Sequence, residues 1–416
     1  MSVKKNYTLV ILVILTFFVI SFLTNIIGPL IPEIIKSYEL SLTMVSFLPF
    51  AFFVAYGVMS IPAGILTEKY GEKKVMLAAF VVSFVGALLF AVNPNYIMSI
   101  LSLFLIGAGM AMLQVVINPL LRTAGGEADF SFFSILAQLF FGLASFISPL
   151  VYSYLVLNLN NPAKQNFILK LLSGLVPEQL PWVSLYWIFA VIAFLMVGVI
   201  LLFRFPKVTL NDDEKPGALA THVQLLKNPT VMLFFLGIFC YVGSEQGVAN
   251  WMSEFLSVYH GYNPQTTGAQ IIAWFWGMMT AGTFVGLFLV KLFDSRYIII
   301  AFTMAAIISL TAALFGSATV ALYAFPSIGF FIAVMYPIII SLGLNSVKEH
   351  HGSFSGILIT GICGGAVVPL IIGFIGDHFH LKAGMLFLYV SFGYILSIGM
   401  WAKPLISNLS EQKRKK

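Results

Sequence analysis

The chain has very little charge for its length: only 9% of its 416 residues are Asp, Glu, Lys or Arg. A soluble domain carries about 25% charged residues, so this chain cannot cover a large water-exposed surface. It also lacks a polar segment long enough to build a core, since the two longest run from about 158 to 181 and from about 206 to 229. These shortages argue against a soluble domain and favour a protein embedded in lipid.

Cysteine is almost absent as well. Cys240 and Cys363 are the only two, and each lies in an apolar stretch, so the sequence predicts no disulfide framework and no metal site. No histidine pair has the spacing of a two-histidine metal site, and no phosphate-binding loop or nucleophile–base pair is present. We therefore expect no cofactor and no enzymatic activity. The net charge of +6 is spread over loop ends, so we expect no nucleic-acid partner.

Apolar runs are what the chain has in abundance. It is 60% hydrophobic with a mean hydropathy of +0.98, and its runs of about 20 residues can cross a ~30 Å hydrocarbon core. We predict an all-α integral membrane protein. Its twelve transmembrane helices are expected at about residues 7–32, 43–67, 74–92, 96–121, 131–157, 183–205, 230–258, 267–292, 297–316, 318–345, 353–377 and 381–402.

The longest predicted cytoplasmic loop divides the twelve spans into six and six. We predict an N-terminal six-helix bundle at 1–205, a cytoplasmic linker at 206–229 and a C-terminal six-helix bundle at 230–416. Paired bundles of this kind bind their substrate near the membrane midplane, between the halves.

Basic residues predict the orientation. Of the 22 lysines and arginines, all but Lys36, Lys164, Lys170 and Lys382 fall on one predicted side, so the positive-inside rule places both termini in the cytoplasm. The short loops favour a bacterial inner membrane, and we expect a monomer in the lipid bilayer.

Glu245 is the acid that lies deepest in a predicted span, midway along an apolar stretch from about Val231 to Val258. An ionised group there costs at least ~2.5–3.5 kcal/mol on insertion scales, and such groups usually mark a substrate or ion pathway. The alternative is that Glu245 is protonated, or paired with a neighbour, and only holds two helices together.

Uncharged polar and aromatic residues in the spans could bind a polyol. Amides both donate and accept hydrogen bonds without net charge, as sugar hydroxyls do, although they also join helices to one another. Flat aromatic rings can cover the apolar faces of a sugar. The candidate substrate-binding residues are Asn25, Gln114, Asn118, Gln138, Tyr241, Glu245, Gln246, Asn250, Trp251, Trp274 and Tyr336.

Prolines follow two of these candidates directly. Asn118 precedes Pro119 in the first half, and Tyr336 precedes Pro337 in the second half. Interrupted helices in corresponding halves indicate a binding site, so we expect a break at each position.

The loop after the second span, Gly64–Lys74, carries a glycine, an acid and a basic pair. It resembles the loop between helices 2 and 3 of the major facilitator superfamily, with Glu68 where that family usually has aspartate. A short charged turn that obeys the positive-inside rule is the alternative explanation.

Five further segments resemble the fucose and glucose/galactose permease branch of that superfamily: Leu113–Pro119, Leu136–Gln138, Tyr241–Glu245, Met335–Ile339 and Gly361–Asp377. The resemblance implies a sugar:cation symporter that works by alternating access. One departure matters. The branch often has an acid on span 1, where this chain has Gly28, and some members have glutamate on span 4, where it has Gln114.

The coupling ion is therefore open at this level. Coupling could run through a proton on Glu245, use sodium bound near Glu245, or be lost. Our leading hypothesis is import of a glucose-, galactose- or fucose-like monosaccharide driven by protons or sodium. The alternatives are a sugar uniporter, a major-facilitator drug exporter and a sugar sensor that transports nothing.

Overall fold

The computed structural model describes residues 6–126, 130–164, 166–205, 219–347 and 351–404. Within these residues, twelve helices are long and apolar enough to cross a membrane, as the apolar runs predict. The elements of the first half are α1 (Tyr7–Thr24), α2 (Ile27–Tyr38), α3 (Leu42–Tyr70), α4 (Glu72–Val92), α5 (Tyr96–Gly125), α6 (Phe130–Asn158), the short helix α7 (Phe167–Ser173) and α8 (Ser184–Leu202).

The second half repeats the arrangement. Its elements are α9 (Leu219–Leu226), α10 (Pro229–His260), α11 (Ala269–Leu292), α12 (Ser295–Phe315), α13 (Ala318–Ile332), α14 (Met335–Leu344), α15 (His351–Thr360), α16 (Gly364–His378), α17 (Leu381–Met385) and α18 (Phe387–Trp401). Part of the predicted linker, residues 206–218, lies outside the described residues, and the rest of it contains α9.

Several helices begin where side chains replace the missing backbone partners of a first turn. Ser41 accepts from the Met44 N–H at the start of α3, and Asn95 accepts from the Met98 N–H at the start of α5. Asn228 caps α10, with Pro229 in the first helical position. Such caps satisfy donors that lipid cannot.

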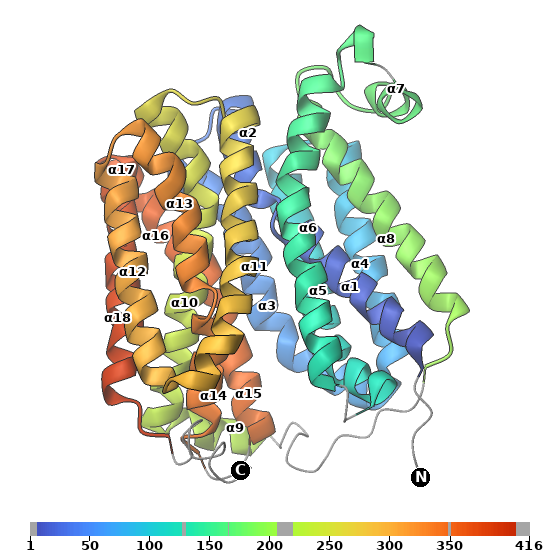
Figure 1. The fold of residues 1–416 in the computed structure, drawn as a ribbon. Helices are drawn as coiled ribbons and strands as arrows, with labels where there is room; N and C mark the ends of the chain where they lie inside the picture. The colour runs from blue at the N-terminus through green and yellow to red at the C-terminus, as the bar shows by residue number, and fades with distance from the viewer. Residues whose placement is uncertain (1–5, 127–129, 165, 206–218, 348–350, 405–416) are drawn as a thin grey trace.

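The two halves stand side by side (Figure 1). We call the end that carries α7 the outer end and the end that carries α9 the inner end. The helix α3, the second span of the first half, packs against α16, the fifth span of the second half, while α6 and α11 form the reciprocal pair. This exchange of equivalent helices is what a two-fold relation between the halves requires.

Candidate functional site

The helix α10, which runs uninterrupted from Pro229 to His260, carries Glu245 near its middle. The Tyr241 hydroxyl, one turn earlier, donates to Glu245 Oε2 at 2.6 Å, and Gln246 Nε2 donates to Oε1 at 3.1 Å. Both carboxylate oxygens therefore accept a hydrogen bond from α10 itself. Within the described residues, no basic side chain forms an ion pair with Glu245.

Gln246, one of the two donors to Glu245, is close to the other half. Gln246 is 4% exposed, and a Cβ added to Gly365 of α16 would lie 3.1 Å from Gln246 Cγ and 3.0 Å from Phe53 Cγ. Because Phe53 belongs to α3, these contacts place Gln246 at the seam between the halves. The centre of the Tyr241 ring lies 5.7 Å from the centre of the Tyr336 ring on α14.

Two interrupted spans border this region. The first span breaks between α1 and α2 at Asn25 and Ile26, and the tenth breaks between α13 and α14 at Ala333 and Val334. Each break starts four residues before a proline, Pro29 or Pro337, which cannot donate to the carbonyl four residues earlier. The two breaks are not in equivalent spans, because the two-fold relation pairs span 1 with span 7 and span 4 with span 10, and both α10 and α5 are continuous.

The break expected at Asn118–Pro119 is absent, whereas the one expected from Tyr336–Pro337 is present one turn before Pro337. The helix α5 runs unbroken through Pro119, because a membrane helix can absorb one missing bond. Tyr336 and Pro337 lie inside α14, just after the break in that span. The first-half interruption is at Asn25 instead.

The predicted amides fall into different surroundings. Asn25 is buried, and its Nδ2 donates to Ser145 Oγ of α6 at 2.8 Å, so it also joins two helices of one half. Asn118 and Gln138 are exposed. Among the predicted amides, two enclosed atoms have no hydrogen-bond partner within the described residues: Gln114 Oε1 and Asn250 Nδ2. These two atoms are available to a ligand.

The tryptophans are placed differently from expectation. Trp251 is fully buried, and its Nε1 donates to the Pro369 carbonyl of α16 at 3.2 Å, so it packs between helices. Trp274 is 56% exposed and meets Phe146 edge-on. Trp276 is 4% exposed, and its Nε1 has no partner within the described structure. Sequence reasoning favoured Trp274 over Trp276 because hydropathy does not show which face of α11 points inward.

Gly28 occupies the position at which the sugar permease branch often has an acid, and it is tightly packed. A Cβ at Gly28 would collide with the carbonyl oxygen of Ala249 on α10 and would lie 3.1 Å from its carbonyl carbon. The position is therefore a close contact between α2 and α10, and no carboxylate fits there in this conformation.

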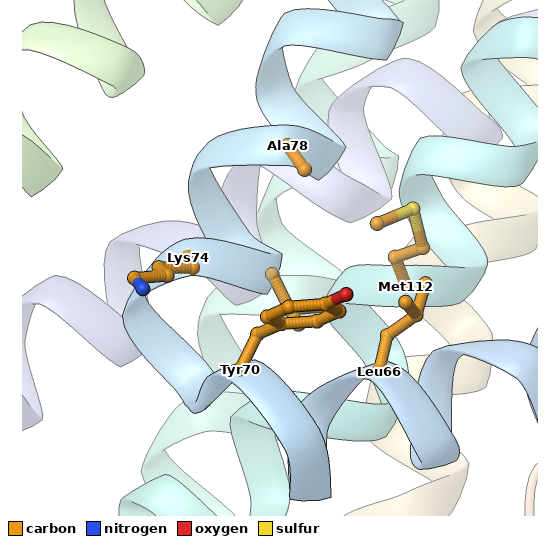
Figure 2. Close-up of a pocket in the computed structure, with 6 residues that line it drawn as sticks. Leu66, Tyr70, Lys74, Ala78 and Met112 are labelled. Carbon is orange, nitrogen blue, oxygen red and sulfur yellow. The ribbon is translucent and has the colours of Figure 1, made fainter.

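A separate pocket of about 220 Å³ lies at the inner end, between α3, α4 and α5. Figure 2 shows the Tyr70 ring lying across it, next to Leu66 and Met112, while Lys74 points away at its edge. None of the predicted site residues lines it. In the first turn of α4 beside it, Lys73 donates to the carbonyls of Leu201 and Phe203 at the end of α8, and so binds a helix end rather than acting only as a solvated charge.

Metal binding finds no support in the described part of the chain. It contains no group of three or more His, Cys, Asp or Glu side chains that could hold a metal ion.

Comparison with known proteins agrees with this architecture. The family model described as Major Facilitator Superfamily matches residues 13–369. A glucose/galactose transporter of Brucella abortus is 28% identical over 96% of this chain and 95% of its own length. The L-fucose-proton symporter of Escherichia coli is 26% identical over 87% of this chain and 85% of its own length.

Solved structures show the same fold. A crystal structure of the Escherichia coli fucose:proton symporter matches with a TM-score of 0.68 and 24% sequence identity, and the match covers 96% of this chain and 100% of that one. The predicted fold class and the predicted resemblance to the sugar permease branch are thus confirmed.

Proposed function

Because the chain belongs to the Major Facilitator Superfamily, we propose that it imports a monosaccharide by alternating access, in symport with a proton. The relatives named above are transporters of glucose, galactose or fucose. Their names also support the expectation that the chain is not an enzyme. The direction, the ion and the sugar are our inference for this chain.

The observation that carries the proposal is the pair of hydrogen bonds to Glu245 at the seam. Tyr241 and Gln246 donate to its two oxygens at 2.6 and 3.1 Å. A carboxylate held in this way is stabilised without a counter-ion, and it can still take up a proton when one donor turns away. A group that changes charge at the seam can make movement of the halves depend on protonation.

The same geometry favours a proton over sodium. Sodium is a hard cation and needs several oxygen ligands around it. The two oxygens of Glu245 instead accept from an O–H and an N–H donor, whose positive ends would repel a cation, and no group of three or more His, Cys, Asp or Glu side chains in the described part of the chain could hold a metal ion. A proton requires only the carboxylate.

A sugar would be held between the halves by groups from both. The first half offers Gln114 Oε1, and the second offers Asn250 Nδ2, Gln246 and the ring of Tyr336. An enclosed donor or acceptor without a partner costs free energy that a matching hydroxyl recovers. Such groups therefore favour a polyol over an apolar drug.

Membrane orientation follows from the lysines and arginines. We propose that the inner end, with both termini, faces the cytoplasm of a bacterium, since the loops at that end carry most of the basic residues.

The test is uptake of labelled glucose, galactose and fucose into proteoliposomes under an imposed pH gradient, and separately under a sodium gradient. Accumulation with the pH gradient alone supports the proposal. Accumulation that requires the sodium gradient would make sodium, not a proton, the coupling ion, and would leave the proposed substrate class unchanged.

Two other outcomes would replace the proposal. Exchange of labelled for unlabelled sugar without accumulation would indicate a uniporter, which Gly28 in place of an acid makes the main competitor. Movement of no sugar would leave drug export, tested by dye efflux, or sugar sensing, tested by binding without transport.

A further inference from the structure

We propose that Asp377 is the gating residue of the outer end: its carboxylate closes the path between the halves by capping the first turn of α3. This inference rests on the alternating access proposed above. Asp377 lies in the last turn of α16, in the second half, whereas α3 belongs to the first half. Its Oδ1 accepts from the Leu42 N–H at 2.8 Å, and its Oδ2 accepts from the Thr43 N–H at 2.8 Å.

The first turn of α3 needs this carboxylate. A helix leaves four N–H groups without helical partners at its start. The Val45 N–H makes the first helical bond, to the Ser41 carbonyl, and the Ser41 side chain accepts from the Met44 N–H. Asp377 supplies the partners for the two N–H groups of α3 that precede Met44, those of Leu42 and Thr43. The cap of α3 is therefore complete only while the halves are closed at this end.

Asp377 is poorly placed for its own helix. A negative side chain is unfavourable at a helix C-terminus and favourable at an N-terminus. Asp377 stands at the C-terminus of α16 and meets the N-terminus of α3. The residue therefore gains its stabilisation from the other half, as a gate requires and as a local cap would not.

Neighbouring contacts let the two helices approach closely enough. Ser46 Oγ, one turn further along α3, lies 3.3 Å from the Pro369 carbonyl of α16. A Cβ at Gly373 would lie 2.6 Å from the Leu42 carbonyl oxygen, and one at Gly376 would lie 2.8 Å from Leu42 Cδ1. A second link, from Gln265 Nε2 to Glu33 Oε1 at 2.9 Å, joins α2 to the segment before α11. In the open state all of these contacts must separate.

The experiment measures the opening of the outer end directly. Spin labels are placed at Val92→Cys and Phe315→Cys, the exposed last residues of α4 and α12 in opposite halves, after Cys240→Ala and Cys363→Ala remove the native thiols. Pulsed electron spin resonance then gives the distance distribution in lipid nanodiscs without sugar. We expect Asp377→Ala to raise the ratio of long to short distances about tenfold, and Asp377→Asn, which keeps one acceptor oxygen, to raise it less.

The control is Asn95→Ala, which removes a side-chain cap at the outer end of α5 within a single half. It should leave the distribution unchanged. Unchanged distributions in both Asp377 variants, or an equal shift in Asn95→Ala, would overturn the gate. The labels report on the outer end without sugar, so the two proposals can fail separately. A shift to longer distances in Asp377→Ala, in a protein that takes up no sugar, would support the gate and contradict the proposed substrate. Sugar uptake by the unmodified protein without a shift in Asp377→Ala would support the substrate and contradict the gate.

Discussion

The hydroxyl of Tyr241 donates a 2.6 Å hydrogen bond to Glu245 Oε2, one turn further along α10. Both residues lie on one continuous helix, so the pair moves as a unit when the halves rearrange. What changes between states is therefore the surroundings of the pair, including Tyr336 on α14 and the seam beside Gln246. A rigid pair in changing surroundings is suited to taking up a proton on one side and releasing it on the other.

Glu245→Gln is expected to abolish concentrative sugar uptake. Glutamine keeps the shape of the side chain and can still accept from Tyr241, but it cannot exchange a proton. Accumulation under a pH gradient should fall to the equilibrium level, while exchange of labelled for unlabelled sugar continues. Full accumulation in this variant would remove Glu245 from the coupling role.

Tyr241→Phe tests the donor rather than the acid. Hydrogen bonds to charged groups contribute about 1.5–3 kcal/mol, so we expect uptake under a pH gradient to fall about tenfold or more. The matched control is Tyr394→Phe, which removes another hydroxyl that bonds to α10, at the Leu233 carbonyl, 2.8 Å away. Uptake rates measured side by side decide the matter, and equal losses in both variants would mean that the Tyr241 hydroxyl acts only on stability.

Much of this architecture is predictable because lipid imposes a simple rule. Every span must be apolar for about 20 residues and must satisfy its own backbone, so the spans and the 6+6 division can be read from hydropathy. The depth of Glu245 follows from the same pattern. Direction around a helix axis does not, because in lipid both the buried and the exposed faces are apolar. For that reason the sequence did not distinguish Trp276 from Trp274.

The gate at Asp377 shows a second limit. In the sequence it ends the Gly361–Asp377 segment that resembles the sugar permease branch, but nothing in that segment indicates a role for its carboxylate. Its partners are backbone N–H groups of Leu42 and Thr43, more than 300 positions away. Backbone donors carry no residue-type signal, so only the folded chain reveals the contact.

Trp276→Phe is expected to weaken sugar binding without loss of stability. The enclosed Trp276 Nε1 has no partner among the described residues, and an unsatisfied buried donor costs about 1–3 kcal/mol. Removing it should raise the melting temperature of the sugar-free protein and reduce sugar-induced stabilisation. Trp251→Phe is the contrast, since its Nε1 has a partner in Pro369, and we expect it to lower the melting temperature. Unaltered sugar affinity in Trp276→Phe would exclude that donor from the site.

Gly28→Ala tests the contact that occupies the place of the branch's acid. The added methyl would collide with the Ala249 carbonyl, and overpacking of this kind costs about 1–3 kcal/mol. Because α2 belongs to one half and α10 to the other, the cost applies only while these helices are in contact, so the variant should favour the state in which they separate. Uptake should fall, and labels at Val92→Cys and Phe315→Cys should report longer distances.

Gly198→Ala, on α8 with nothing within 4 Å of the added methyl, is the control and should be neutral. If Gly28→Ala transports sugar as fast as the unmodified protein, the contact between Gly28 and Ala249 does not limit transport. Tight packing would then not be the reason why this position lacks an acid, and a different coupling mechanism would have to be.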